Sequence, residues 1–378
     1  MTSADESFHH QITDTFATVA QSDRSWTEKV CAMACAPDGS LQLAFGIGKY
    51  PNRGVMDAYA GISRGVEQWT VRASRELGKD PHATMAGPIT YEVLEPLEVI
   101  HFALAPNDTL PICFDWTFTA AVPPVMENRE HHRSRDGARL DADIVRYHHT
   151  GTATGWVDID GTRTEFDDWI STRDHSWGVR YQVGTPPPDI APAPVPEGVA
   201  TLVNWCPVLC TRPDGSRYAL HWYYQRHSIG TWSRIEMQGG VEHADGRREQ
   251  FIAMVPDLTF DDHNRRFTGG TVSMTMGDGS LRPLTVTPVS ETGFHLGTGL
   301  YHGFDGQSHG QWRGRLHTEG EYFADCADPE TARRVHQHRD CVIRVDDPVG
   351  GGVGIGNLQS IVAGADAAMG LTAEASFL

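Results

Sequence analysis

The chain has 378 residues, of which 39% are hydrophobic, 9% aromatic and 21% charged, and this composition is typical of a globular protein rather than a disordered one. Its formal net charge of −18 would repel polyanions, which excludes nucleic acid and anionic membrane surfaces as expected partners. The length exceeds that of one ordinary hydrophobic core, so we expect two domains.

The N-terminal stretch MTSADESFHHQ has neither a basic start nor an apolar run. No segment of the chain reaches the roughly 18 apolar residues of a membrane span. The seven cysteines are an odd number in a chain without a visible signal peptide, which favours reduced thiols. We therefore expect a cytoplasmic protein without a membrane span, and a homodimer is compatible with the sequence.

Asp-Gly turn signals recur along the chain between short segments rich in β-branched and aromatic residues, a pattern that predicts antiparallel strands. Residues 112–120, ICFDWTFTA, alternate between bulky apolar and polar side chains. Residues 155–166, GWVDIDGTRTEF, predict two strands joined by a turn at Asp160 and Gly161. Residues 217–228, RYALHWYYQRHS, are bulky on both faces and predict a strand buried on both sides. Residues 241–255 predict another hairpin.

Helical signals are scarce. The best is DPETARRVHQHR at 328–339, where Asp328 fits the N-cap and Pro329 the first helical position. The glycine-rich run at 350–357 is not followed by a helix pattern, so we expect no dinucleotide site there. Many strands with few helices predict an all-β sandwich or barrel architecture.

The one break in composition is TPPPDIAPAPVPEG at 185–198, near the middle of the chain. Proline cannot donate to a sheet ladder, so this stretch is expected to be loop or polyproline. We interpret it as the connection between an N-terminal β domain, 1–184, and a C-terminal β domain, 199–378. The alternative is a long surface loop within a single domain.

The densest polar chemistry is RDHSWG at 173–178, inside a segment that otherwise reads as a strand. In an extended chain the side chains of Asp174 and His175 point to opposite faces. The face with His175, Trp177 and Tyr181 is expected to line a pocket, and the face with Asp174 and Arg180 to meet the other domain. Only a kink, for which Gly178 is the candidate, would bring Asp174 and His175 together. The alternative is a purely structural stretch in which an arginine pairs with Asp174 and Trp177 fills the core.

Motifs for metal and nucleophile chemistry are missing from the sequence. No H-E-x-x-H or C-x2-C pattern occurs, so we predict no metal site. No G-x-S-x-G occurs either, which disfavours covalent hydrolysis. Aromatic strands with scattered His, Asp, Glu and Tyr suit a hydrophobic ligand cavity or proton transfer within one.

On RDHSWG, together with the stretches FGIGKYPNRGVMDAYAGISRG, GPITYEVLEPL and WRGRLHTEGEYFADCADPETARRVHQHRD, the chain resembles the AttH-like and carotenoid 1,2-hydratase superfamily. The resemblance covers most of the chain and implies two lipocalin-like β-barrels packed together, with a hydrophobic substrate and no redox cofactor. Relatives add water to isoprenoid alkenes or act as cyclases without a cofactor. Carotenoid hydratases carry D-H-E-W-type residues where this chain has Asp174, His175, Ser176 and Trp177, so a carboxylate is replaced by serine.

The resulting hypothesis is a cofactor-independent hydratase, isomerase or cyclase acting on an isoprenoid, steroid or polyketide-like small molecule. Asp174 or His175 would be the acid–base group, and aromatic rings would stabilise a developing cation. The candidate substrate-binding residues are Trp177, Arg180, Tyr181, His221, Tyr223, His302 and Glu127. The alternative is a lipocalin-like carrier that binds a hydrophobic molecule without changing it.

Overall fold

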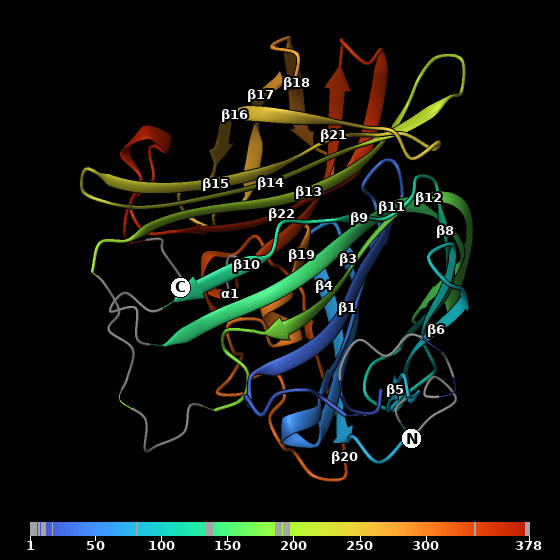
Figure 1. Ribbon diagram of the computed structural model, residues 1–378. Coiled ribbons are helices and arrows are strands. Elements are labelled where there is room, and N and C mark those ends of the chain that lie inside the picture. The colour runs from blue at the N-terminus through green and yellow to red at the C-terminus, as the bar shows by residue number, and fades with distance from the viewer. Residues whose placement is uncertain are drawn as a thin grey trace.

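The computed structural model describes residues 6, 8, 13–16, 18–80, 82–133, 139–185, 191, 197–335 and 338–374. Their strands form two sheets in which every pairing between strands is antiparallel, and the two sheets curve into barrels that pack against each other (Figure 1). The predicted all-β architecture of two lipocalin-like barrels is therefore confirmed.

The first sheet has the order β20-β4-β3-β2-β1-β12-β11-β8-β7-β6-β5, and β9 and β10 pair with β11. Its strands are β1 (Trp26–Cys35), β2 (Gln42–Tyr50), β3 (Val55–Arg64), β4 (Glu67–Glu76), β5 (Met85–Ala86), β6 (Ile89–Glu95), β7 (Val99–Leu104), β8 (Ile112–Ala120), β9 (Val125–Met126), β10 (Glu130–Arg133), β11 (Leu140–Ile159), β12 (Thr162–Val179) and β20 (Leu316–Phe323).

The second sheet has the order β18-β17-β16-β15-β14-β13-β22-β21-β19, and a further pairing between β18 and β21 closes it. Its strands are β13 (Ala200–Thr211), β14 (Arg217–Ile229), β15 (Trp232–Glu242), β16 (Arg248–Phe260), β17 (Phe267–Met276), β18 (Leu281–Pro288), β19 (Phe294–His295), β21 (Arg339–Asp347) and β22 (Gly352–Ala363). The short helices are α1 (Pro329–Val335), η2 (Pro51–Arg53), η3 (Leu296–Gly299) and η4 (Ala367–Met369).

The predicted strands and turns form for the expected local reasons. β8 buries Phe114, Trp116 and Phe118 in the core of the first barrel. The predicted turn joins β11 to β12, with Asp160 and Gly161 at φ 54° and 78°. β15 and β16 form the predicted hairpin in the segment 241–255, since they pair antiparallel up to Glu242 and Arg248 around a short turn. β14 has the predicted two-sided burial in its first half.

The predicted helix begins as expected but is shorter. The side chain of Asp328 accepts a hydrogen bond from the backbone N–H of Thr331 at 2.9 Å, which confirms the N-cap. α1 ends at Val335, and residues 336–337 lie outside the described part of the chain. The predicted extension to residue 339 is wrong, because Arg339 begins β21 and pairs with Ser360 of β22.

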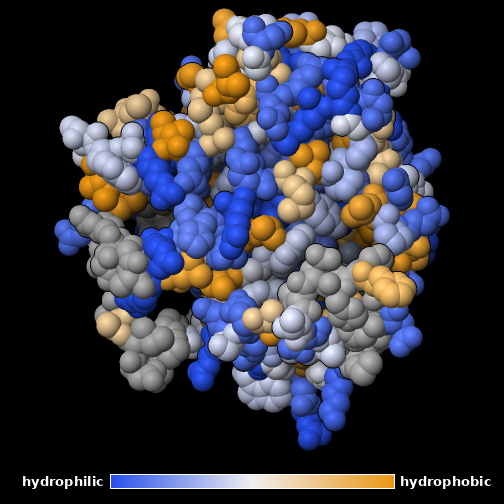
Figure 2. Space-filling view, viewed as in Figure 1, coloured by the Kyte–Doolittle hydropathy of each residue, from blue (hydrophilic) through white to orange (hydrophobic). Residues whose placement is uncertain are grey.

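β11 and β12 lie at the junction of the barrels, against β13 and β22 (Figure 1). Most of the proline-rich stretch 185–198 lies outside the described residues. The first sheet nevertheless includes β20, which lies beyond that stretch in sequence and pairs with β4. Figure 2 shows a mostly hydrophilic face with scattered hydrophobic residues, as expected for a strongly acidic chain. None of the helices in the described part is long and apolar enough to span a membrane.

Candidate active site

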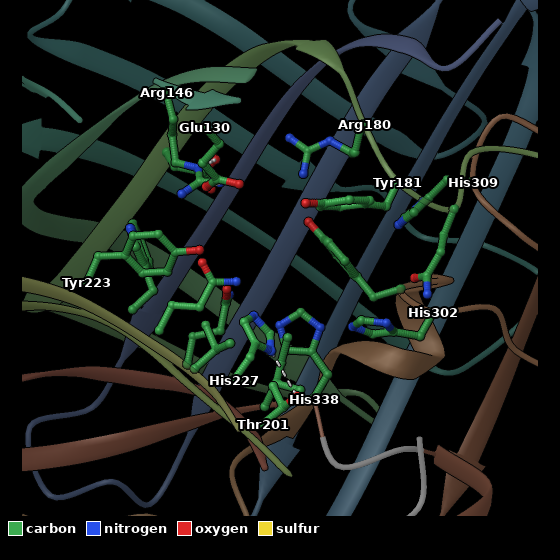
Figure 3. Close-up of a pocket in the computed structure, with 18 residues that line it drawn as sticks. Glu130, Arg146, Arg180, Tyr181, Thr201, Tyr223, His227, His302, His309 and His338 are labelled. Atoms are coloured by element: carbon green, nitrogen blue, oxygen red, sulfur yellow. Dashed lines mark hydrogen bonds and ion pairs between the residues drawn. The ribbon is translucent and has the colours of Figure 1, made fainter. Parts of the chain in front are cut away.

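A cavity of about 540 Å³ lies between the two barrels (Figure 3), and we refer to it as the interbarrel cavity. The first sheet and the residues just after β12 contribute Glu130, Arg146, Asp174, Arg180, Tyr181 and Gln182. The second sheet contributes Thr201, Val203, Trp205, Tyr223, Gln225, His227, Gln359 and Ile361. The remaining wall comes from Tyr301, His302, His309 and His338. Charged and aromatic side chains therefore share one cavity.

The path of β12 decides which of its side chains reach this cavity. Its pairing with β1 runs without a break from Ile170 to Val179, so the side chains alternate as predicted. Asp174 pairs with Cys31 of β1 and His148 of β11, and these residues share the face toward the second barrel. Asp174 and His175 therefore lie on opposite faces of β12 and form no dyad.

Burial and nearby positive charges have opposite effects on the pKa of the Asp174 carboxyl group. Burial raises its pKa above the usual value, and the opposing influence of Arg146 and Arg180 does not cancel this effect. The Nε of Arg146 lies 3.7 Å from Oδ2 of Asp174. Arg146 is shared, because its Nη1 and Nη2 each lie 2.9 Å from a carboxylate oxygen, of Glu127 and Glu130 respectively. Asp174 therefore presents to the cavity a carboxyl group that keeps its proton to a higher pH than an exposed aspartate does.

His175 belongs to a different part of the molecule. Its Nε2 lies 2.9 Å from Oε1 of Glu28, and its Nδ1 lies 3.2 Å from the hydroxyl of Tyr147. It lines a separate pocket of about 180 Å³ next to the interior of the first barrel. Trp177, on the same face, lines a third space of about 730 Å³. The face that carries His175 and Trp177 therefore lines two other spaces and not the interbarrel cavity.

The strand alternation ends just before Arg180 and Tyr181. β12 stops at Val179, after Gly178 adopts φ 135°. As a result both Arg180 and Tyr181 line the interbarrel cavity, although an extended chain would place them on opposite faces. The prediction that Tyr181 shares the face of His175 is therefore wrong. Gly178 marks the end of the alternation, not a kink that joins Asp174 to His175.

A buried lysine lies behind the wall of the cavity and contacts an imidazole. Nζ of Lys29 lies 3.0 Å from Nε2 and 3.3 Å from Nδ1 of His309, and 4.0 Å from the ring centroid of Tyr301. Burial lowers the pKa of Lys29 to about 8, against the opposing effect of Cys31 and Asp57. Burial and the nearby Lys29 also lower the pKa of His309 well below its usual value. His309 is therefore a neutral imidazole on the cavity wall.

Glu127 and His221 lie beneath the cavity in a buried polar group that also includes His148, Trp205 and Glu242. Glu127 accepts a hydrogen bond from Nε1 of Trp205 at 2.7 Å. Nδ1 and Nε2 of His148 lie 3.1 Å and 2.7 Å from Oε1 of Glu127 and Glu242, respectively. Burial would lower the pKa of His148, but Glu242 and Glu127 raise it to about 9, so His148 is a cation at neutral pH. Glu127 and His221 thus support the cavity wall from behind.

Among the described residues, three members of this buried group lie close enough together to be considered as ligands of one metal ion. One donor atom each of Glu127, His148 and His221 lies within 4.8 Å of the others. The imidazoles of His148 and His221, however, are stacked with centroids 3.5 Å apart and planes 17° apart. An imidazole nitrogen binds a metal in the plane of its ring, so two nearly parallel stacked rings cannot both point at one ion. The geometry favours a protonated His148 between two carboxylates, and the expected lack of a metal site stays a prediction.

Tyr223 and His302 line the cavity, as does Arg180 from the predicted set. The guanidinium of Arg146 lies 5.7 Å from the ring centroid of Tyr223. Among the lining residues that sequence reasoning missed are Arg146, His227, Tyr301, His309 and His338. The alternation of residues 145–149, VRYHH, could have placed Arg146 and His148 on one face. No local signal links Tyr301 or His309 to Lys29, from which they are separated by more than half of the chain.

Comparison with known proteins places the chain in a family and supports its fold. Residues 1–372 match the model of a family of unknown function (DUF8625). No curated protein matches the chain in sequence. A crystal structure of an AttH from Nitrosomonas europaea has a TM-score of 0.50 and 12% identity, covering 89% of this chain and 91% of that chain. This likeness confirms, at the level of the fold, the resemblance to AttH-like proteins.

Two further solved structures are similar to this chain with lower TM-scores. Kievitone hydratase from Nectria haematococca has a TM-score of 0.41 and 10% identity, covering 89% of each chain. CghA has a TM-score of 0.48 and 10% identity, covering 90% of this chain and 89% of that chain.

Proposed function

Because the chain belongs to a family whose function is unknown, its activity has to follow from its own residues, and we propose that it is a hydratase-, isomerase- or cyclase-type enzyme. The observation that carries this proposal is the carboxyl group of Asp174, which faces the interbarrel cavity and whose pKa is raised by burial. A carboxylic acid that keeps its proton longer than usual is suited to general acid catalysis.

The proposed reaction starts with proton transfer from Asp174 to a carbon of a substrate double bond. The π bond breaks, a new C–H bond forms, and the cation that remains lies among the rings of Tyr181, Tyr223 and Tyr301. In a hydratase, water then adds to the cation and gives its extra proton to a base. His309 is our candidate for that base, because it lines the same cavity as a neutral imidazole. In an isomerase or cyclase, loss of a proton or attack by a second double bond completes the reaction.

These steps need no electron transfer, so we propose that the enzyme works without a redox cofactor. The aromatic and aliphatic part of the lining, including Val203, Trp205 and Ile361, supports a substrate with an apolar body. The sequence resemblance to hydratases and cyclases supports isoprenoid, steroid or polyketide-like compounds as the first to test.

The test compares the wild-type protein with Asp174→Asn on a panel of unsaturated isoprenoid, steroid and polyketide-like compounds, using chromatography with mass spectrometry. A hydrated product gains the mass of one water molecule, and an isomer differs only in retention time. We expect Asp174→Asn to lower turnover by roughly 100- to 10,000-fold, as is usual for loss of a general acid. Asp143→Asn, on β11 outside the cavity, is the matched control and should retain activity.

Two results would contradict the proposal. The first is a product that Asp174→Asn forms as fast as the wild-type protein. The second is tight, reversible binding of a panel compound that is never converted, which would instead support the lipocalin-like carrier.

A further inference from the structure

Arg180 differs from the other arginine of the interbarrel cavity in its charge partners. Arg146 makes ion pairs with Glu127, Glu130 and Asp174. Arg180, in contrast, has no carboxylate within 4.0 Å among the described residues, and its Nη2 donates a hydrogen bond to the hydroxyl of Ser176 at 2.6 Å. Both arginines line the same cavity, with Arg180 across the space from Arg146 and Glu130 in Figure 3. Arg180 is thus a half-buried positive charge that makes no ion pair among the described residues, although its charge acts on the Asp174 carboxyl group.

An unpaired guanidinium is costly in a partly buried site unless a ligand pairs with it. Two acidic residues, Glu130 and Asp174, line the cavity, and both are neighbours of Arg146. The wall around Arg180 carries neutral hydrogen-bonding groups, among them Gln182, Tyr301 and His309. In a chain with 49 acidic and 31 basic residues, an arginine that faces a cavity without a carboxylate partner is unexpected from composition alone.

We infer that Arg180 binds a carboxylate of the substrate, so that the substrate combines an apolar body with a single anionic head. This inference rests on the proposed function, because it names the kind of molecule that Asp174 would protonate. The planar fork of a guanidinium matches the two oxygens of a carboxylate. One guanidinium without an ion pair matches one negative charge on the ligand, and a dianion would be repelled by Asp174 when that group is ionised.

The position of Arg180 also orients the substrate. Asp174, Ser176 and Arg180 follow one another along the same side of the chain, and Ser176 holds the guanidinium. A carboxylate held by Arg180 therefore lies at the same wall as the Asp174 carboxyl group. The apolar body is left to the opposite wall, where Val203, Trp205 and Ile361 lie. The double bond that reacts is accordingly expected near the anionic head.

The experiment measures binding of two matched probes, 2-naphthoate and 2-naphthamide, by isothermal titration calorimetry at neutral pH and low ionic strength. They have the same rings and differ in the negative charge. For the wild-type protein we expect naphthoate to bind at least about tenfold more tightly than naphthamide, a difference of about 1.4 kcal/mol. For Arg180→Gln we expect the naphthoate affinity to fall to that of naphthamide, whose own affinity should not change.

An unchanged naphthamide affinity would show that the cavity of Arg180→Gln is intact. Arg163→Gln, on the exposed part of β12 beside Glu165, serves as the matched control and should keep the naphthoate preference. Equal affinities of the two probes in the wild-type protein, or no binding of naphthoate, would overturn the inference without any variant. A naphthoate preference that survives in Arg180→Gln would overturn the role of this residue. None of these measurements involves turnover, so failure here is distinct from failure of the Asp174→Asn test.

Discussion

At the residue scale, burial shifts the pKa values of ionisable groups in the cavity wall and behind it. Asp174 and Asp340 are both aspartates with a raised pKa, whereas burial lowers the pKa of both Lys29 and His309. In each case the charged form is disfavoured because water is removed from around it. The interbarrel region thus holds groups able to exchange protons near neutral pH.

Asp340 of β21 offers the clearest test of this effect. Burial raises its pKa to about 7, although the side-chain amide of Asn357 donates a hydrogen bond to Oδ1 at 2.7 Å. The unfolded chain binds fewer protons at this site than the folded chain between about pH 4 and pH 7. Asp340 therefore costs little stability at pH 4, and its penalty grows as the pH rises to 7 and stays present above that pH.

We predict that Asp340→Asn is more stable than the wild-type protein at pH 8, by up to roughly 4 kcal/mol, and equally stable at pH 4. Denaturant unfolding at the two pH values measures the difference. Asp346→Asn, which removes an exposed carboxylate from the same strand, is the control and should change stability little. A gain for Asp340→Asn that is as large at pH 4 as at pH 8 would show that titration is not its cause.

At the element scale, β12 carries the site because it is central in the first sheet and pairs with both β1 and β11. Its regular pairing keeps Asp174 on one face and His175 on the other. The strand ends where Gly178 takes a φ that residues with a side chain rarely adopt, and a Cβ at this position would clash with the backbone oxygen of Asp143. Gly178 thus allows β12 to lie against β11 while the chain turns Arg180 and Tyr181 into the cavity.

We predict that Gly178→Ala destabilises the protein by roughly 2–4 kcal/mol, because it combines backbone strain with a backbone clash. Gly161→Ala is the matched comparison, since Gly161 also has a positive φ but nothing lies within 4 Å of the added Cβ. That variant should cost only about 1–2 kcal/mol. Thermal and denaturant unfolding give both values, and equal losses would mean that the clash with Asp143 is relieved at no cost.

At the scale of the whole molecule, the two barrels are linked by more than the chain connection. β20 comes from the C-terminal half but forms an edge of the first sheet, next to β4. The buried guanidinium of Arg72 on β4 finds its carboxylate partners, Glu319 and Glu321, on β20. We therefore regard 185–198 as a boundary between two halves of the sequence and not between two independent folding units. We propose that neither half forms a complete barrel structure without the other.

We predict that a fragment of residues 1–184 expressed alone is not a stable monomer, because it leaves β4 as an open edge and Arg72 without its ion pairs. Size-exclusion chromatography and thermal unfolding test this. As a control, cleavage of the intact protein at a protease site placed within 185–198 should leave the two pieces associated. A fragment 1–184 that is monomeric and unfolds cooperatively would refute the prediction.

The sequence by itself determined the features that depend on neighbours along the chain. Alternation predicted β8 and β12, Asp-Gly predicted the turn between β11 and β12, and Asp328 predicted the start of α1. It also placed Asp174 and His175 on opposite faces, because side chains in any extended strand alternate. The end of the helix was not predicted, since Arg339 is held in β21 by pairing with β22.

Only the tertiary structure decided which residues surround Asp174. Arg146 reaches it through the pairing of β11 with β12, and Lys29 lies on β1, on the other side of β12. His309 is 280 residues from Lys29 yet contacts it. Such neighbours are set by strand order and by the packing of one barrel on the other, which bring distant segments together and leave no periodic signal in the sequence. For the same reason, only the positions of the carboxylates in the described part of the chain show that Arg180 makes no ion pair.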